Sequence, residues 1–152
     1  MHRPEAVTTV EVILQTKGRQ VWSVSPDTMV FDAVALMAEK NVGALLVMDA
    51  DRLVGIVSER DYTRKVALLG KNSRQTPVRD ILTEAVHQVT PQTTLHQCME
   101  LMSDKRVRHL PVVADGKVAG VVSIGDLVNW IIHTQNVAID QLQAYIAGGY
   151  PA

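Results

Sequence analysis

Apolar and polar residues follow one another along this chain in a pattern that occurs twice. Each block opens with a short apolar strand, continues with an amphipathic helix and two nearly unbroken apolar strands, and closes with a second helix. Helical spacing, as at Val30, Val34 and Met37, predicts a helix with one buried face, whereas unbroken apolar runs predict strands buried on both faces. The expected strands are 21–24, 44–48 and 53–57 in the first block and 86–89, 110–113 and 118–122 in the second.

Capping and turn residues mark the ends of the predicted elements. The first helix of each block is expected to begin near Asp27-Thr28 or Thr93-Thr94, which offer good N-caps. The second helices are expected to cover 59–69 and 125–132. Asp115-Gly116 between the last two strands predicts a tight hairpin turn.

Three segments outside the blocks also have helical features. They are Thr8-Thr9-Val10-Glu11, a capping-box pattern for a helix ending at Gly18; Thr76-Pro77, with Pro at the first position of a short helix through Leu82; and 137–147, with apolar residues at helical spacing. The first two segments precede the two blocks, so we expect them to play equivalent parts.

The two blocks are copies of one sequence. When the chain is shifted by 65 residues, 21–62 (copy one) lies over 86–127 (copy two) without a gap, and 14 of the 42 aligned pairs are identical. Ordinary composition gives about 6% identity, so the chain contains a duplication. Each copy is a β-α-β-β-α repeat of about 60 residues, which is marginal alone. We therefore expect an α/β (α+β) fold in which two pseudo-symmetric repeats share a core.

The polar segment 71–75 sets the expected division of the chain. Residues 1–75 form the first repeat with an N-terminal helix, and residues 76–152 form the second repeat with a C-terminal helix. The two repeats together make one module.

Composition narrows the class of protein. Fifteen basic and sixteen acidic residues give a net charge of −1, so no overall basic field exists for nucleic acid and any anion site must be local. The single cysteine, Cys98, aligns with Ala33, which predicts a small core residue, and it excludes an intramolecular disulfide. No apolar run approaches the roughly 20 residues that cross a bilayer. A cytoplasmic protein without a membrane segment is expected, and no metal-ligand spacing occurs.

A Gly-x-x-Ser-x-x-Asp motif closes each copy. It comprises Gly55, Ser58 and Asp61 in copy one and Gly120, Ser123 and Asp126 in copy two. Each motif lies where a buried strand ends and a helix begins, and unpaired N–H groups at a helix start attract phosphate. The Asp, one turn later, suits the two hydroxyls of a ribose. Ser-x-x-Asp is also a plain capping box, so a purely structural role stays open.

The duplicated pattern resembles a pair of cystathionine-β-synthase-type (CBS) domains. The resemblance rests on the two motifs, on their order, and on Val107-Arg108-His109-Leu110-Pro111 at the second strand of copy two. It implies a regulatory module that binds adenosine-containing ligands between its repeats. The ligand would be AMP, ADP, ATP or NAD(H), with no catalytic cofactor, and the module would form a homodimer through helices 29–40 and 94–105.

The resemblance also implies two nucleotide sites. One would use Ser123 and Asp126 with Val21, Trp22, Val42, Gly43 and Ala44; the other would use Ser58, Arg60 and Asp61 with Val86, His87, Val107 and Leu110. Arg108 and His109 lie where the family supplies phosphate contacts. Copy one has Arg60 where copy two has Gly125, and it has Gly43-Ala44 where copy two has Arg108-His109. The two sites should therefore differ in affinity or in ligand.

These observations predict a regulatory adenine-nucleotide sensor that signals to an unidentified partner protein and is not an enzyme. Three alternatives remain open. The chain could be a scaffold with an empty cleft, or a nucleotide hydrolase with His109 as its base. It could also bind nucleic acid through Arg60, Arg64 and Lys65, against its net charge.

Overall fold

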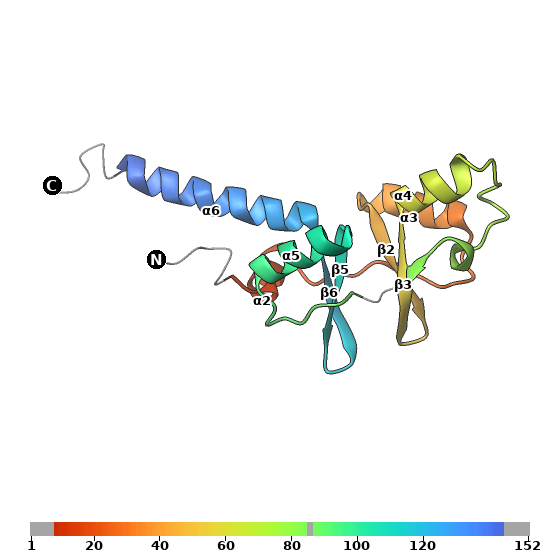
Figure 1. Ribbon diagram of the computed structural model, residues 1–152, viewed down its shortest axis with the longest axis horizontal. Coiled ribbons are helices and arrows are strands. Elements are labelled where there is room, and N and C mark those ends of the chain that lie inside the picture. The colour runs from red at the N-terminus through yellow and green to blue at the C-terminus, as the bar shows by residue number, and fades with distance from the viewer. Residues whose placement is uncertain (1–7, 85–86, 145–152) are drawn as a thin grey trace. The chain divides into compact units, whose positions relative to one another are not determined.

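Short strands and helices alternate along the chain in the computed structural model, which describes residues 8–84 and 87–144 (Figure 1). The helical elements are α2 (Val10–Lys17), α3 (Val30–Lys40), α4 (Glu59–Tyr62), α5 (Leu95–Lys105), α6 (Ile124–Ala144), a π-helical turn η1 (Thr63–Ala67) and a 3-10 turn η2 (Val78–Asp80). The strands are β1 (Ser23–Val24), β2 (Ala44–Asp49), β3 (Arg52–Ser58), β4 (Thr83–Glu84), β5 (His109–Ala114) and β6 (Lys117–Ser123). The predicted mixed α+β fold is confirmed.

The chain divides into two compact units that do not follow the order of the sequence. The copy-two unit contains 8–18, 90–110 and 122–144, and the copy-one unit contains 19–84, 87–89 and 111–121. The expected division at residue 75 assigned the N-terminal helix to the first repeat. In the structure, α2 lies instead with the helices of copy two.

A four-stranded sheet with the order β1-β2-β3-β4 forms the frame of the copy-one unit. β1 runs parallel to β2, and the pairs β2–β3 and β3–β4 are antiparallel. The buried cluster consists of Val30, Ala33, Met37, Leu45, Val47, Val57, Val66, Val78 and Ile81. Apolar positions at helical spacing in α3 and the inward positions of β2 and β3 supply most of it, as their periodicity predicts.

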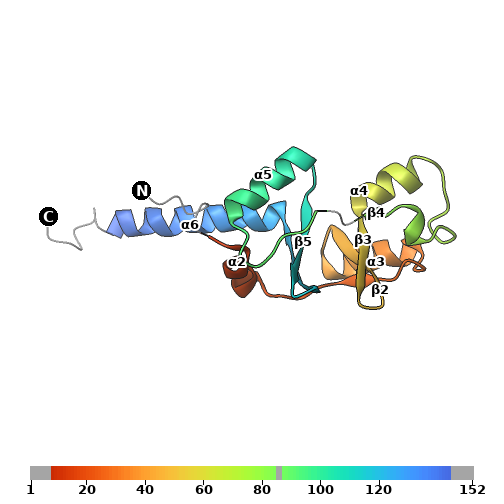
Figure 2. The same cartoon turned by 60° about the horizontal axis from the view of Figure 1, so that its bottom comes forward.

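Three helices form the body of the copy-two unit. α2 and α5 both pack against α6 (Figure 2). The buried side chains on these helices are Val10, Ile13, Leu14, Leu95, Cys98, Met102 and Leu127. Cys98 is fully buried, and burial raises the pKa of its thiol to about 11, which confirms that it is a core residue.

The first helix of each copy begins against a segment from elsewhere in the chain. The Val30 N–H donates to the Thr76 carbonyl and the Val78 N–H to the Thr28 carbonyl, both at 2.8 Å. In copy two, the Leu95 N–H donates to Thr8 and the Val10 N–H to Thr93, also at 2.8 Å. The segments before the two copies therefore play equivalent parts, as expected.

Several predicted helix ends differ from the structure. α3 begins at Val30 rather than near Asp27-Thr28, because the Thr28 hydroxyl accepts from the Ser25 N–H and the 73–76 backbone closes the helix start. Thr94 is confirmed as the N-cap of α5, in a capping box with Gln97. At α2, Thr9 is the N-cap but makes no side-chain cap hydrogen bond, because backbone carbonyls of copy two take the helix-start N–H groups.

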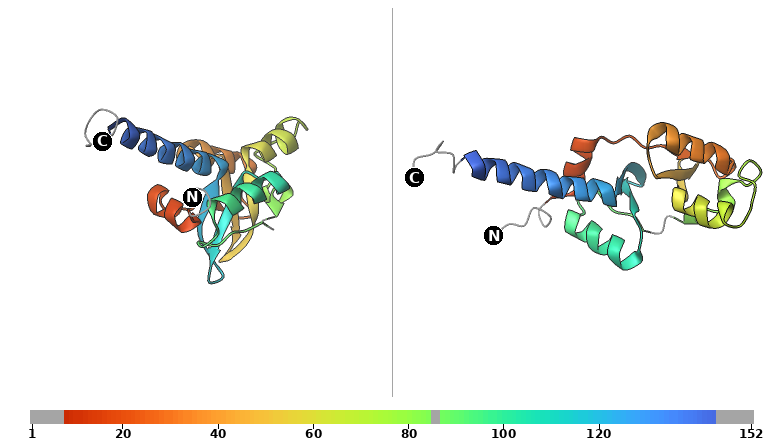
Figure 3. Two further views of the ribbon diagram at one scale, coloured as in Figure 1. Left: turned by 60° about the vertical axis from the view of Figure 1, so that its left-hand side comes forward. Right: turned by 90° about the horizontal axis from the view of Figure 1, so that it is seen from above.

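Other predicted elements change in length. η2 covers only Val78–Asp80, with Pro77 at the N-cap rather than inside the helix, and β4 was not predicted. The expected helices 125–132 and 137–147 are one continuous helix, α6, which Figure 3 shows along its length; 145–147 lie outside the described residues. Val86 of the expected strand 86–89 also lies outside them, while Val89 bridges Val112 in parallel.

Within the described ranges 8–84 and 87–144, no helix has the length and apolar character needed to cross a membrane.

We expect Gly55→Ala to destabilise the fold by about 1–3 kcal/mol, as overpacking does in a rigid core. A Cβ atom at Gly55 would lie 2.4 Å from the Thr83 carbonyl oxygen and 2.8 Å from Leu82 Cδ1, and the backbone oxygen cannot move without breaking the β3–β4 pairing. The free energy of unfolding in urea measures the effect.

Gly125→Ala is the matched control for this prediction. Its Cβ would meet only Ser123 Oγ, at an ordinary 3.6 Å, inside the first turn of α6. Alanine is favoured over glycine in a helix, so this variant should be as stable as the wild type or up to about 1 kcal/mol more stable. Equal stability of Gly55→Ala and the wild type would contradict the packing described for β3 and β4.

Candidate functional site

The motif of copy one forms a closed hydrogen-bond network at the junction of β3 and α4. Ser58 is the N-cap, and its Oγ accepts from the Asp61 N–H at 3.1 Å. The Ser58 N–H and hydroxyl both donate to Asp61 Oδ2 at 3.0 Å. The capping-box interpretation of this motif is therefore correct for copy one.

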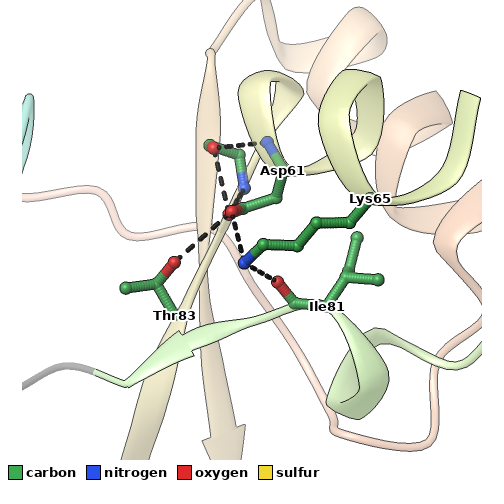
Figure 4. A network of polar contacts seen from close by, with 5 residues as sticks. Asp61, Lys65, Ile81 and Thr83 are labelled. Carbon is green, nitrogen blue, oxygen red and sulfur yellow. Dashed lines mark hydrogen bonds and ion pairs between the residues drawn. The ribbon is translucent and has the colours of Figure 1, made fainter. Parts of the chain in front are cut away.

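The second oxygen of Asp61 is also engaged (Figure 4). Asp61 Oδ1 lies 3.1 Å from Lys65 Nζ and accepts from the Thr83 hydroxyl at 3.3 Å. Lys65 Nζ in turn donates to the Ile81 carbonyl at 2.9 Å. Only 12% of the Asp61 side chain is exposed, so a ligand hydroxyl would have to displace one of these partners.

The motif of copy two forms the same reciprocal capping box, with fewer further contacts. Asp126 Oδ2 accepts from the Ser123 N–H at 2.8 Å, and Ser123 Oγ accepts from the Asp126 N–H at 3.1 Å. Among the described residues, no hydrogen bond to Asp126 Oδ1 is found, and no acceptor takes the Ser123 hydroxyl proton. Copy two thus keeps one carboxylate oxygen and one hydroxyl donor available.

The Lys17 side chain pairs with Asp126, and two further basic residues lie near it. Lys17 Nζ lies 2.6 Å from Asp126 Oδ2. The Ile124 N–H donates to the Arg108 carbonyl at 2.9 Å, which brings the start of β5 next to the start of α6. Burial lowers the pKa of His109, the Lys17 and Arg108 cations lower it further, and Asp126 opposes them, so these groups share one neighbourhood.

Copy one lacks this charge at the equivalent place. The Glu59 N–H donates to the Gly43 carbonyl at 3.0 Å, and Ala44 pairs with Ser58. Neither residue has a polar side chain. The sequence difference between Gly43-Ala44 and Arg108-His109 therefore becomes a difference in charge beside the two motifs.

A pocket of about 300 Å³ lies in the copy-two unit beside Asp126. Its lining is Ile13, Thr16 and Lys17 from α2 with Asp126, Asn129, Trp130 and His133 from α6. The Trp130 indole N–H donates to the Thr8 hydroxyl at 3.3 Å, which fixes the ring. Sequence reasoning missed Asn129 and His133 as lining residues, although their spacing of three and seven from Asp126 places all three on one helix face.

The predicted site residues are distributed over both units. The copy-two unit holds Ser123, Asp126, Val107, Arg108, His109 and Leu110, and the copy-one unit holds Ser58, Arg60, Asp61, Val21, Trp22, Val42, Gly43, Ala44 and His87. Val86 lies outside the described residues. The structure thus brings Arg108 and His109 to the motif of their own copy, as it does Gly43 and Ala44.

Trp22 and Val42 also contribute to packing in the copy-one unit. Both are partly buried against its core, and Lys40 Nζ lies 4.4 Å from the centre of the Trp22 ring. A base could stack on this face of Trp22 only if the Lys40 cation moved, because a cation over the ring face is itself an attractive contact.

We expect His109→Gln to reduce the loss of stability on acidification. The pKa of His109 is lowered from 6.5, first by burial, so just below pH 6.5 the unfolded chain binds a proton at this residue that the folded chain does not. The stabilising effect of neutral His109 is complete above its unfolded pKa and is lost as the pH falls below it.

Urea unfolding at about pH 7.5 and pH 5.5 measures this linkage. The wild type should lose more free energy of unfolding between the two pH values than the His109→Gln variant does. Equal losses would show that His109 titrates as it does in the unfolded chain.

Comparison with known proteins supplies the family. The family model of the CBS domain matches residues 14–68 and 78–133. The Arabidopsis thaliana "CBS domain-containing protein CBSX3, mitochondrial" is 42% identical over 153 residues, covering 94% of this chain and 74% of that protein.

Solved structures give the same result. The CBS domain protein NE2398 is 50% identical, with a TM-score of 0.79, and covers 82% of this chain and 98% of its own. A hexameric CBS-CP12 protein from bloom-forming cyanobacteria is 28% identical, with a TM-score of 0.73, over 80% of this chain and 67% of that one. This chain therefore belongs to the CBS domain family and carries two CBS domains, a pair known as a module of ligand binding and regulation.

Proposed function

We propose that this chain is a regulatory sensor that binds an adenine nucleotide (AMP, ADP, ATP or NAD(H)) without catalysing a reaction. Binding shifts the population of its conformations, and a partner protein responds to the shift. Such a response requires that the ligand bind one conformation more tightly than the other. Membership of the CBS family supports the class of function, and the motif of copy two supports the ligand.

The open donor and acceptor of the copy-two motif carry the proposal. Asp126 is oriented by the Ser123 N–H through Oδ2, and Oδ1 can accept from a ribose hydroxyl. The Ser123 hydroxyl can donate to a phosphate oxygen, since its lone pair already accepts from the Asp126 N–H. A carboxylate for the sugar and a hydroxyl for the phosphate thus stand one helical turn apart.

The charge around this motif favours an anionic ligand. α6 is 21 residues long, and the start of a helix attracts negative charge through its dipole and free N–H groups. The cations Lys17 and Arg108 lie near the same end, His109 beside them can donate a hydrogen bond as a neutral imidazole, and Asp126 is the acid that faces them. The chain as a whole has a net charge of −1, so this is a local site of the kind its composition requires.

The motif of copy one supports a weaker site. The Ser58 hydroxyl donates to Asp61, and both oxygens of Asp61 are engaged, so a ligand must first break contacts there. The two sites of the pair therefore differ in affinity, and the site at Asp126 is the tighter one.

Substitution of Asp126 should remove about half or more of the stabilisation by nucleotide. In a thermal-unfolding panel of AMP, ADP, ATP and NAD, the correct ligand at 100 times its dissociation constant stabilises the wild type by about 2.7 kcal/mol. We expect Asp126→Asn to weaken binding about 10-fold or more, because a hydrogen bond to a charged group contributes about 1.5–3 kcal/mol.

Asp61→Asn is the matched control, since it makes the same change in the equivalent motif. It should leave the tighter site intact. The proposal fails if none of the four nucleotides raises the unfolding temperature of the wild type, and the assignment to copy two fails if Asp61→Asn weakens binding as much as Asp126→Asn does. Recovery of intact ATP and NAD after incubation excludes the hydrolase alternative.

An exposed apolar face of α6 supports a homodimer. Ile124, Val128, Ile132 and Leu142 are 38–58% exposed and lie on one side of the helix. The cyanobacterial relative is hexameric by its description, so a CBS protein of this fold can assemble.

Light scattering during gel filtration should give twice the mass of the chain for the wild type. A Val128→Glu variant should shift towards the monomer, and a monomeric wild type would exclude the dimer.

A further inference from the structure

The cation at the copy-two motif comes from a remote part of the chain. Lys17 is the last residue of α2, and its ammonium lies 2.6 Å from Asp126 Oδ2, 109 residues away. Gly18 follows it with φ 101°, a conformation that favours glycine and ends the helix there. The pair therefore joins the end of α2 to the first turn of α6.

The cation at the copy-one motif is held differently. Lys65 lies four residues after Asp61 in the same helical segment, and its ammonium also donates to the Ile81 carbonyl. Lys65 is thus fixed by its own unit through two contacts, and a ligand gains little by attracting it. The two motifs have equivalent carboxylates but unequal counter-ions.

Lys17 and Asp126 line the same pocket of about 300 Å³. This volume is at the lower end of the range for small-molecule sites, so it suits one part of a nucleotide rather than the whole. The Lys17 side chain is 34% exposed and the Asp126 side chain 21% exposed. Partly exposed ion pairs contribute little stability, so breaking this one costs little.

We propose that Lys17 makes this site select phosphorylated adenosine compounds over adenosine. In the empty pocket its ammonium neutralises Asp126. When a nucleotide enters, the ammonium moves to the phosphate, and Asp126 is left with both oxygens near the ribose hydroxyls. This inference rests on the proposed function, since it assigns the phosphate-reading residue of the same site.

If Lys17 moves from Asp126 to the phosphate, AMP and adenosine should respond differently to its removal, which would not be so if Lys17 and Asp126 formed a fixed structural pair. Adenosine has no anion to receive the ammonium, so it must compete with Lys17 for the carboxylate. AMP supplies an anion that replaces the carboxylate as the partner of Lys17, and hydrogen bonds between ionised groups are the strong ones. Removal of Lys17 should therefore weaken the binding of AMP without weakening the binding of adenosine.

Calorimetric titration of the full chain with AMP and with adenosine tests this inference. For Lys17→Met we expect AMP binding to weaken about 10-fold or more, in line with the loss of a charged hydrogen bond. Adenosine binding should stay unchanged or tighten, because Asp126 is free. Lys17→Arg keeps the charge and should preserve most of the preference for AMP.

Lys117→Met is the control for net charge, because it removes one positive charge at the exposed start of β6. It should keep the wild-type ratio of AMP affinity to adenosine affinity. If the wild type binds both ligands and Lys17→Met keeps that ratio, the role of Lys17 is excluded while the proposed function stands. If the wild type binds neither AMP nor adenosine, the inference about Lys17 falls, while the thermal-unfolding panel of four nucleotides still decides the proposed function.

Discussion

Backbone hydrogen bonds at the helix starts hold each unit of this molecule together. A buried helix start leaves N–H groups that need acceptors, and here the acceptors come from segments outside the copy. Thr76 and Thr8 supply these carbonyls to α3 and α5, and each is a buried polar residue with 8% exposure. The hydrogen bonds between the segment at Thr8 and the start of α5 also fix where α2 lies. The position of Lys17 beside Asp126 is thus a result of how the fold satisfies its backbone.

The two motifs share one backbone geometry, but their carboxylates, Asp61 and Asp126, have different charged and hydrogen-bonding partners. In copy one, Asp61 is saturated by its own serine, by Lys65 and by Thr83 of the strand β4. In copy two, Asp126 meets a lysine from a distant helix and keeps an oxygen available. Duplication supplied the geometry, and differences in a few side chains left both carboxylate oxygens engaged in copy one and, among the described residues, one oxygen without a hydrogen bond in copy two.

The periodicity of apolar residues in the sequence was sufficient to predict the main strands of the fold. The strands at 44–48, 53–57, 110–113 and 118–122 were predicted almost to the residue, because long apolar runs with a turn between them have few other interpretations. Helix starts were less predictable. Thr28 and Thr9 look like caps, yet backbone carbonyls from distant segments close those helices, and no local pattern reports such a contact.

The site was predictable in part for the same reason. Ser58, Asp61, Ser123 and Asp126 follow from the repeated motif, because their spacing fixes their geometry at a helix start. The open state of Asp126 does not follow from spacing. It depends on Lys17 reaching across from α2 and, within residues 8–84 and 87–144, on the absence of a neighbour such as Thr83, which are facts of tertiary packing. For the same reason, the sequence assigned α2 to the first repeat, which it precedes, whereas in the structure α2 packs with the helices of copy two.

The placement of α2 also bears on how the chain folds as it is made. α2 is synthesised before the other described elements, but α6, against which it packs, is synthesised after all of them. Contacts that span such a separation in sequence form late and slow the search for the native state. The copy-one sheet, built from neighbouring strands, can assemble while α2 waits with its apolar face uncovered. A chaperone that shields α2 until α6 has been synthesised would therefore assist the folding of the copy-two unit.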